Sequence, residues 1–437
     1  MPDQPRTSRR TDQRQVLESP LSATWRPAVR ERAVLVGIGR GIAEEDLDEL
    51  ASLAYSAGAD PVARIVQSRS DPDPGTYIGR GKLAELHDTL HSTGAEGVIL
   101  DDELTPGQLR SLEERLGAKV IDRTALILDI FALHARSREG KVQVELAQLN
   151  YLLPRLRGWG EAMSRLGGGI GTRGPGETKL EVDRQHIRRR IARLRREIKD
   201  MSRTREVKRA RRQRGATLQI AIAGYTNAGK STLMNQLTGA DVVVADQLFA
   251  TLDPTVRRLE LPSGRSATIS DTVGFVRKLP HDLVEAFRST LEEVTLADLI
   301  LHVADAASRE LDEQIQAVRR VLAEIGAGEI PEVLVLNKVD RLAGSSRARV
   351  ARRFPGSVPC SALTGEGTDG VLEALDAALP HPPVEVTLLV PWGREDVTAR
   401  LYREGEVLST DTDGEGTIVR ARVDERELAV VREFVVR

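Results

Sequence analysis

The feature that most constrains this chain is the stretch Gly224-Tyr-Thr-Asn-Ala-Gly-Lys-Ser231, which matches the phosphate-loop pattern G-x-x-x-x-G-K-[ST]. The apolar run TLQIAIAG precedes it and a helix is expected to begin near Lys230, which is the setting that the pattern requires. Glycines let backbone N–H groups turn inward around a phosphate, and the helix N-terminus adds partial positive charge. Lys230 is expected to reach the β- and γ-phosphates, and the Ser231 hydroxyl to bind Mg²⁺.

A second pattern, Asn337-Lys338-Val339-Asp340, follows the predicted strand IPEVLVL later in the chain. The carboxylate of Asp340 can accept hydrogen bonds from guanine N1–H and N2–H₂, a pair of donors that adenine lacks. Binding of ATP would leave a polar group unpaired there. Ser361 and Ala362 follow the strand-like run PGSVPC and are expected to complete the guanine pocket. These patterns predict a preference for guanine.

Two loops between these patterns are expected to contact the γ-phosphate and the metal ion. Asp271-Thr272-Val273-Gly274 ends the run RSATISD, where Asp271 can hold the hydration shell of Mg²⁺ and Gly274 can offer its amide to the γ-phosphate. Thr251, within Phe249-Ala250-Thr251-Leu252-Asp253, is in the right interval for a second Mg²⁺ ligand. The ordered motifs predict a GTPase.

The residues predicted for the nucleotide site fall into three overlapping groups. The catalytic residues are Lys230, Thr251 and Gly274, and the Mg²⁺ ligands are Ser231, Thr251 and Asp271. The nucleotide contacts are Gly224, Tyr225, Thr226, Asn227, Ala228, Gly229, Lys230, Ser231, Thr232, Phe249, Ala250, Thr251, Leu252, Asp253, Asp271, Thr272, Val273, Gly274, Asn337, Lys338, Val339, Asp340, Ser361 and Ala362.

One position departs from the Ras-like pattern. Phe275 follows DTVG, at the place where Ras-like GTPases carry the glutamine that orients the attacking water. An apolar ring cannot orient a water molecule. We therefore expect slow hydrolysis by the isolated protein, with the water positioned by a partner or by another group in the loop.

The composition is that of a globular protein long enough for about three domains. The chain has one cysteine, Cys360, which fits a reducing compartment, and no apolar run of the ~20 residues needed to span a bilayer. We expect a cytoplasmic monomer whose contact with membranes is at most peripheral.

Strand and helix patterns predict a disordered arm at 1–29, a parallel α/β domain at 30–125, a helical arm at 126–215, a mostly parallel α/β GTPase domain at 216–383 and a small α+β domain at 384–437. The last domain is expected to contain a strand, the helix REDVTARLYREGE, the strand TIVRARV and a final helix.

Basic charge is concentrated in the helix predicted at residues 181–214, which carries 15 Lys/Arg and 5 Asp/Glu and hence a net charge of +10. Because the whole chain has a net charge of −2, the remainder carries −12. This concentration indicates a polyanionic partner that is met at one place. An apolar seam favours an antiparallel helix pair over an isolated solvated helix, and it consists of Ile187, Ile191, Leu194, Ile198 and Met201.

Directly before this helix, residues 167–176 contain six glycines and formally match G-x-G-x-x-G. A dinucleotide-binding turn needs a buried strand before it, but the preceding YLLPRLRGWGEAMSRLG is charged and interrupted, and Pro175 and Gly176 are expected to delay the helix. We expect the loop to meet RNA phosphates, since glycine-dense backbone can approach structured RNA closely. A flexible linker without contacts is the alternative. The predicted RNA contacts are Gly169, Gly171, Arg173, Gly174, Lys179, Arg188, Arg189, Arg195 and Arg196.

These segments together resemble the HflX GTPases, a ribosome-associated family of the translation-factor-related class. The resemblance covers about residues 30–380 and rests on GYTNAGKST, FATLDPT, DTVGF, NKVD, IGRGK (78–82), QLNYLLPRL (148–156) and GGGIGTRGPGETKLE (167–181). It implies a protein that binds GTP and GDP, associates with the 50S ribosomal subunit and its rRNA, and splits stalled or idle 70S ribosomes. It also implies that the N-terminal domain and the glycine loop are pushed toward the peptidyl-transferase centre.

Two other functions share these motifs. A GTP-dependent assembly factor for the large subunit would act on immature particles, so that only the bound particle distinguishes it. A non-ribosomal regulatory GTP switch would dock its basic helix on an acidic protein or an anionic membrane surface. A second phosphate loop is not identified in the N-terminal domain, because IGRGK lacks the spacing.

Overall fold

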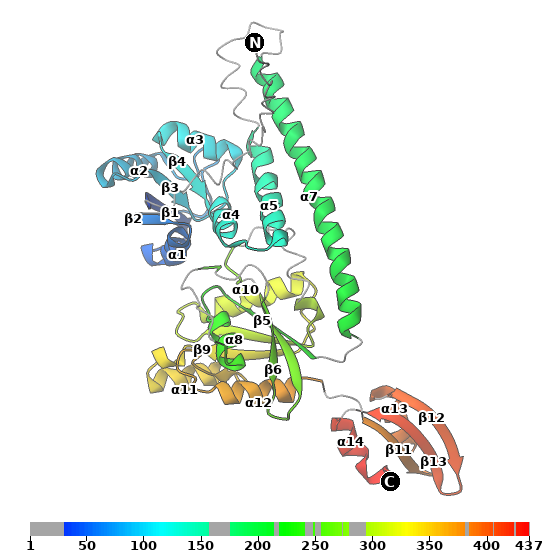
Figure 1. Ribbon diagram of the computed structural model, residues 1–437. Coiled ribbons are helices and arrows are strands. Elements are labelled where there is room, and N and C mark those ends of the chain that lie inside the picture. The colour runs from blue at the N-terminus through cyan, green and yellow to red at the C-terminus, as the bar shows by residue number, and fades with distance from the viewer. Residues whose placement is uncertain are drawn as a thin grey trace, which may run out of the picture.

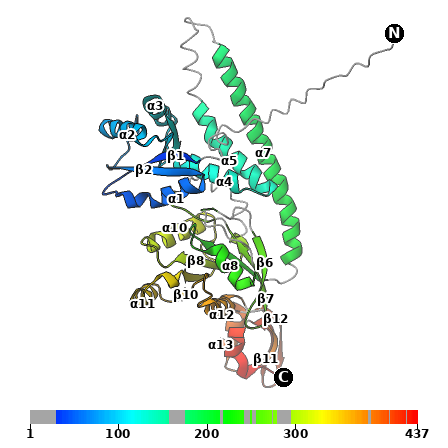
Figure 2. The same ribbon diagram turned by 60° about the vertical axis from the view of Figure 1, so that its left-hand side comes forward.

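The computed structural model describes residues 30–156, 175–213, 218–240, 248–249, 255–272, 274–278, 294–380, 384–404, 406–423 and 425–436. Figures 1 and 2 show an N-terminal α/β domain with long helices beside it, a second α/β domain below it and a small domain at the far end. The predicted fold class, two α/β domains with a helical arm and a small α+β unit, is confirmed. Among the described helices, none is both long enough and apolar enough to cross a membrane.

The N-terminal domain has three layers. Its parallel sheet has the order β2-β1-β3-β4, with β1 at Glu31–Gly39, β2 at Ala59–Ser68, β3 at Gly97–Leu100 and β4 at Lys119–Asp122. Its helices are α1 (Asp48–Ser56), α2 (Arg80–Thr93), α3 (Pro106–Leu116) and α4 (Arg123–His134). Successive strand residues face opposite sides, so Leu35 packs with α1 and α4, whereas Val34 and Val36 pack with α2 and α3.

The described part of the arm contains the helices α5 at Arg138–Arg155 and α7 at Pro175–Gln213. Two ion pairs join the helices, Arg138 with Glu197 and Glu145 with Arg190. The later residue of α5 pairs with the earlier residue of α7, so the two helices run in opposite directions. The seam predicted on α7 packs against α5, with Ile191 and Leu194 buried. The predicted antiparallel pair is therefore confirmed.

One expectation about the arm is wrong. Pro175 and Gly176 do not delay the basic helix, because α7 begins at Pro175. Proline suits the first turn of a helix, since its fixed φ is helical and the N–H that it lacks would have no partner there. The glycine-rich stretch before Pro175, with Gly169, Gly171, Arg173 and Gly174, lies outside the described residues.

The segment QLNYLLPRL fixes the end of α5 to the N-terminal domain. Arg155 donates to the carbonyl oxygen of Leu104 at 2.8 Å and pairs with Asp122, at the end of β4, at 3.2 Å. Burial raises the pKa of Asp122, and the hydrogen bond from Ala125 N–H and the charge of Arg155 oppose that rise. A buried carboxylate needs such partners, so this segment has a structural role at the base of the arm.

The second α/β domain has a six-stranded sheet in the order β10-β9-β8-β5-β7-β6. Its strands are β5 (Leu218–Gly224), β6 (Thr255–Glu260), β7 (Ser266–Asp271), β8 (Leu299–Asp305), β9 (Glu332–Asn337) and β10 (Val358–Pro359). Its helices include α8 (Lys230–Thr238), α10 (Leu311–Glu324), α11 (Gly344–Arg353) and α12 (Thr368–Ala378). The strands pair in parallel except for β6, which forms the predicted hairpin with β7. The carboxyl ends of β5, β7 and β9 therefore bring three sequence motifs to one edge.

The C-terminal domain is an antiparallel sheet in the order β11-β13-β12 with two helices. Its elements are β11 (Val384–Pro391), α13 (Glu395–Glu404), β12 (Glu406–Asp413), β13 (Gly416–Val423) and α14 (Glu425–Val431). The sequence analysis missed β12. Most of its described side chains are exposed and polar, so pairing with β13 stabilises it without the apolar alternation that marks a half-buried strand.

We predict that Leu194→Ala destabilises the helix pair. Leu194 is fully buried in the seam, and truncation of a buried leucine costs about 2–5 kcal/mol of the free energy of unfolding. Urea unfolding of the full chain, followed by circular dichroism, measures the loss. Val182→Ala is the control, because Val182 on the same helix is 46% exposed and its truncation should cost less than about 0.5 kcal/mol. Equal losses in the two variants would contradict the packing.

Candidate nucleotide and RNA sites

The phosphate loop is shaped by two glycines. Gly224, at the end of β5, has φ 154° and Gly229, before α8, has φ 92°. A methyl group on Gly224 would lie 2.2 Å from the carbonyl oxygen of Val303, and one on Gly229 would lie 2.3 Å from Nδ2 of Asn337. Larger residues are excluded at both positions, so strands β8 and β9 determine the path of the loop. Its backbone amides at the start of α8 form a ready anion-binding site.

Lys230 is folded into the loop. Its Nζ donates to the carbonyl oxygens of Gly224 at 3.1 Å and Tyr225 at 2.8 Å. Burial lowers the pKa of this amine to about 8, with Asp271 opposing the fall and Lys338 adding to it. A bound phosphate would restore the charged form, because an opposite charge favours it.

The predicted Mg²⁺ ligands Ser231 and Asp271 lie side by side. The Ser231 hydroxyl donates to Oδ2 of Asp271 at 2.5 Å. The other carboxylate oxygen, Oδ1, is buried and has no hydrogen-bond partner in the described part of the chain. A hydroxyl next to a buried carboxylate fits the hard oxygen ligands that Mg²⁺ prefers. Thr251 lies outside the described residues.

The guanine end is organised by Asn337, the last residue of β9. Its Nδ2 donates to the carbonyl oxygen of Ala228 at 2.8 Å, and its Oδ1 accepts from the amide of Ala362 at 2.9 Å. Ser361 donates its hydroxyl to Oδ1 of Asp340 at 2.6 Å and so orients that carboxylate. Asn337 therefore joins the phosphate loop to the NKVD and Ser361-Ala362 segments.

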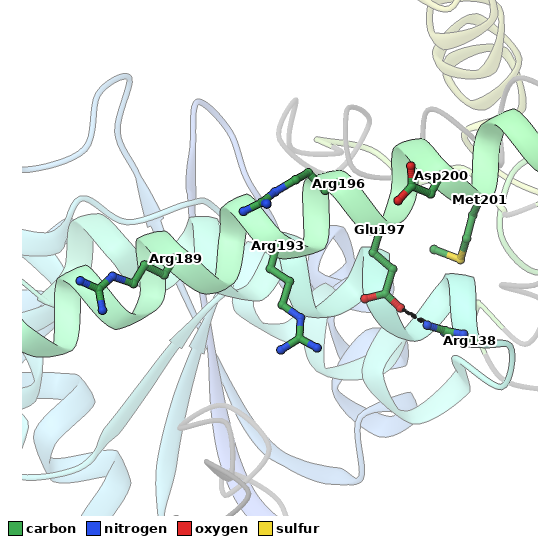
Figure 3. Close-up of a pocket in the computed structure, with 7 residues that line it drawn as sticks. All are labelled: Arg138, Arg189, Arg193, Arg196, Glu197, Asp200 and Met201. Carbon is green, nitrogen blue, oxygen red and sulfur yellow. Dashed lines mark hydrogen bonds and ion pairs between the residues drawn. The ribbon is translucent and has the colours of Figure 1, made fainter.

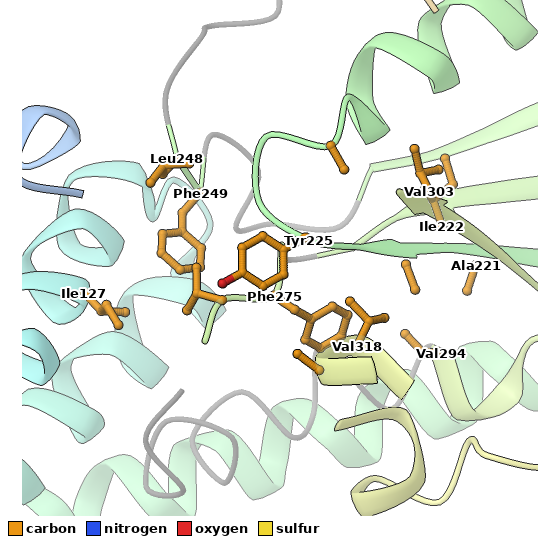
Figure 4. Packing of buried hydrophobic residues seen from close by; sticks show 14 of the residues in the cluster. Ile127, Ala221, Ile222, Tyr225, Leu248, Phe249, Phe275, Val294, Val303 and Val318 are labelled. Atoms are coloured by element: carbon orange, nitrogen blue, oxygen red, sulfur yellow. The ribbon is translucent and has the colours of Figure 1, made fainter. Parts of the chain in front are cut away.

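The DTVG motif continues from β7 and lies against the phosphate loop. A methyl group on Gly274 would lie 2.7 Å from Cγ2 of Thr226 and 2.9 Å from Nζ of Lys230. Phe275 is 2% exposed; its amide donates to Gly224 and its carbonyl oxygen accepts from Thr226 N–H at 2.7 Å. Figure 4 shows its ring within the buried apolar cluster. Phe275 thus has no free polar group with which to orient water.

The phosphate loop and the DTVG, NKVD and Ser361-Ala362 segments meet at this edge of the sheet. Of the predicted loop at residues 249–253, the structure describes only Phe249. The ring of Phe249 packs against that of Phe131 in α4, with the ring centroids 4.6 Å apart. The predicted contacts outside the described residues are Ala250, Thr251, Leu252, Asp253 and Val273.

The predicted RNA contacts on α7 are exposed on the arm. Arg188, Arg189, Arg195 and Arg196 all have exposed side chains, and the backbone of Lys179 lies in the same helix. A depression of about 730 Å³ lies on this surface. Figure 3 shows the residues that line it, which are Arg138, Arg189, Arg193, Arg196, Glu197, Asp200 and Met201. Arginine is the main charged residue of this surface, which suits planar recognition of phosphate.

Known proteins resemble the chain along most of its length. Three family models match it: "GTP-binding GTPase N-terminal" at 44–132, "GTP-binding GTPase Middle Region" at 134–212 and "50S ribosome-binding GTPase" at 219–338. A GTP-binding protein of Sulfolobus solfataricus, solved in complex with GDP, is 25% identical with a TM-score of 0.42, over 80% of this chain and 98% of that one.

GTPase HflX of Caldanaerobacter subterraneus subsp. tengcongensis is 49% identical over 412 residues, which cover 93% of this chain and 94% of the relative. GTPase HflX of Escherichia coli K12 is 46% identical over 379 residues, covering 85% and 88%. The chain belongs to the HflX family of GTPases. The predicted family and enzyme class are confirmed.

In this HflX GTPase, the residues that the sequence analysis missed lie between the N-terminal domain and the nucleotide loops. Arg123, at the start of α4, is 2% exposed. It forms ion pairs with Glu49 and Asp101 and donates to the carbonyl oxygen of Arg277 at 2.9 Å. Burial lowers the pKa of Arg123, but the two carboxylates more than offset this and raise it above its usual value. No local pattern marks Glu49 or Arg123 in the sequence.

Tyr225 of the phosphate loop takes part in the same network. Its hydroxyl donates to Glu49 and accepts a hydrogen bond from the amide of Arg277 at 2.6 Å. Burial and the charge of Glu49 raise the pKa of Tyr225. Lys278 adds ion pairs with Asp101 at 3.1 Å and Asp102 at 2.5 Å. The segment after DTVG is therefore held by the N-terminal domain and the phosphate loop together.

Apolar packing accompanies this polar network in the HflX fold. Figure 4 shows the ring of Tyr225 between those of Phe249 and Phe275, with Ile127 and Leu248 nearby. These residues belong to one buried cluster that includes residues of both α/β domains.

We predict that GDP binding takes up a proton at mildly alkaline pH. The Lys230 amine has a pKa near 8 in the free protein, and a bound phosphate raises it. At pH 8 about half a proton should therefore be taken up per GDP, against nearly none at pH 7. Titration calorimetry in two buffers of different ionisation enthalpy measures the uptake. The same proton count at both pH values would contradict the assignment.

Proposed function

We propose that this HflX-family GTPase binds the 50S subunit and its rRNA, separates stalled or idle 70S ribosomes into subunits, and leaves after GTP hydrolysis. The observation that carries the proposal is the set of hydrogen bonds and ion pairs between the nucleotide loops and the N-terminal domain. Tyr225 and Arg277 both bond to Glu49, so a change at the γ-phosphate can reach the domain that carries the arm. Family membership supports the ribosomal partner.

In this proposal, GTP lies along the edge formed by β5, β7 and β9. Asp340 accepts hydrogen bonds from guanine, and Lys230 contacts the β- and γ-phosphates. Ser231, Asp271 and Thr251 would hold Mg²⁺, which supplies positive charge beside those phosphates. The short contact between Ser231 and Asp271 supports this assignment, as does Oδ1 of Asp271, which is buried and has no partner among the described residues.

The arm supplies the affinity for RNA. Exposed arginines on α7, among them Arg189 and Arg196, exchange counterions for phosphates, which gives a salt-dependent attraction. The glycine-rich loop before α7 contacts folded rRNA through its backbone, with Arg173 and Lys179 adding phosphate contacts. The N-terminal domain and this loop are directed toward the peptidyl-transferase centre.

Splitting follows from a shift in populations. Contacts of the γ-phosphate with the loops at Thr251 and Gly274 favour the RNA-bound arrangement. Gly274 is followed directly by the segment that Arg123 and Asp101 hold, which couples the two sites. Binding energy at the subunit displaces an intersubunit bridge, and hydrolysis serves release and recycling.

Sedimentation of 70S ribosomes with the protein tests the proposal. We predict subunit separation with GTP or a non-hydrolysable GTP analogue, and none with GDP or ATP. Separation that requires hydrolysis, or no separation, would contradict it. Binding to immature particles alone would favour a large-subunit assembly factor, and sedimentation that is insensitive to ribonuclease treatment would favour a non-ribosomal switch.

A matched pair of variants tests the arm in the same assay. Arg189→Gln with Arg196→Gln removes two charges from α7, and Arg349→Gln with Arg352→Gln removes two exposed charges from α11. The arm variant should reduce the slope of log affinity against log salt by about 2, whereas the α11 variant should leave it unchanged. Equal slopes for the two variants would count against an RNA-binding arm.

A further inference from the structure

Thr226 of the phosphate loop carries a hydroxyl with no hydrogen-bond partner in the part of the chain that the structure describes. Its side chain is buried, with 7% exposed, and its Oγ1 has no hydrogen bond to any described residue. Leaving a buried hydroxyl unpaired costs free energy. A group of this kind in a phosphate-binding loop therefore points to a ligand that completes its hydrogen bonding.

The neighbouring hydroxyls are engaged. Tyr225 donates to Glu49, Ser231 donates to Asp271, and Thr272 donates to the carbonyl oxygen of Ile222 at 2.6 Å. Among the described residues of this loop, Thr226 therefore carries the buried hydroxyl that is available for a hydrogen bond to the substrate.

Thr226 also lies where the γ-phosphate is expected. Its Cγ2 and the Nζ of Lys230 both approach Gly274 so closely that a methyl group there would lie 2.7 and 2.9 Å from them. Its amide bonds to the carbonyl oxygen of Phe275. The Thr226 side chain and the lysine predicted to contact the γ-phosphate therefore both lie beside Gly274, directly before the position where Ras-like proteins carry glutamine.

We propose that the Thr226 hydroxyl contacts the γ-phosphate and the attacking water, and so takes the part that Phe275 cannot play. A hydroxyl can accept one hydrogen bond while donating another, as a glutamine amide does with its two ends. Oγ1 accepts a hydrogen bond from the water and donates its own hydrogen to a γ-phosphate oxygen. The proposal rests on the GTPase activity and requires no ribosome.

The chemical step is ordinary hydrolysis. The water oxygen forms a bond to the γ-phosphorus as the bond to the β–γ bridging oxygen breaks, and the electron pair of that bond leaves with GDP. The proton of the water passes to the released phosphate. Thr226 orients the water and stabilises charge on the γ-phosphate, and it neither gains nor loses a proton overall.

Two substitutions at Thr226 separate its hydroxyl from its shape. Thr226→Val keeps the branched shape beside Gly274 and removes the hydroxyl, whereas Thr226→Ser keeps the hydroxyl. Loss of a group that stabilises charge in a transition state lowers the rate about 10²- to 10³-fold. We expect a loss in this range for Thr226→Val in single-turnover hydrolysis without ribosomes, and a rate within about threefold of wild type for Thr226→Ser.

A binding measurement distinguishes positioning from a structural effect. The affinity for fluorescent GDP should stay within about threefold in both variants, whereas the complex with GDP and aluminium fluoride should form with Thr226→Ser and fail with Thr226→Val. Thr268→Val is the matched control, because Thr268 of β7 donates to the carbonyl oxygen of Leu218 outside the site. It should leave hydrolysis unchanged.

Three results would overturn the proposal. These are hydrolysis by Thr226→Val at the wild-type rate, an equal loss in Thr226→Ser, and a loss of GDP affinity as large as the loss of rate. Because the assay contains no ribosome, none of these results bears on ribosome splitting, and a failure of splitting leaves this test intact.

Discussion

The structure depends on one buried arginine. Arg123 is enclosed between the two α/β domains, and a guanidinium in that position is tolerated only because Glu49 and Asp101 neutralise it and the carbonyl oxygen of Arg277 accepts from it. Two of these partners belong to the N-terminal domain and the third to the segment after DTVG. Because the buried guanidinium of Arg123 needs all of these partners, it favours one arrangement of the two domains. An apolar contact is less directional and would be compatible with several arrangements.

This interaction gives physical content to the coupling that we propose between the bound nucleotide and the ribosome. Tyr225 lies in the phosphate loop, yet its hydroxyl bonds to Glu49 in α1 and to the amide of Arg277. Energetic coupling between distant sites is typically 1–3 kcal/mol, which is comparable to one or two hydrogen bonds to charged groups. If a rearrangement at Gly274 breaks one hydrogen bond of this network, the free energy involved is large enough to change the proposed affinity of the arm for RNA by about one order of magnitude.

The parts that could be predicted from the sequence are those fixed by local chemistry. The phosphate loop, DTVG and NKVD each follow a buried strand of a mostly parallel sheet, so their meeting at one edge follows from topology. The seam of α7 was visible because Ile191 and Leu194 recur at helical spacing. By contrast, Glu49 and Tyr225 are far apart in the chain, and only the docking of two domains brings them together.

Two smaller errors have local causes. Pro175 and Gly176 were expected to delay the start of the basic helix, but proline, although disfavoured in helix interiors, is favoured in the first turn. The strand β12 was missed because its exposed, polar residues lack apolar alternation and are held by pairing with β13. Tyr225 stays a predicted nucleotide contact, and its hydroxyl bonds to Glu49 of the N-terminal domain.

The most direct test of the account removes a single oxygen atom. Tyr225→Phe keeps the ring between Phe249 and Phe275 but removes the hydrogen bonds of the Tyr225 hydroxyl to Glu49 and to the amide of Arg277. The phosphate loop therefore loses its direct hydrogen bond to the N-terminal domain, which should weaken the coupling. The measurement is the ratio of 50S affinities for the protein loaded with a non-hydrolysable GTP analogue and with GDP. We predict a ratio of roughly 5- to 150-fold for the wild type and a smaller ratio for Tyr225→Phe. A variant that binds both nucleotides normally and keeps the wild-type ratio would contradict this prediction.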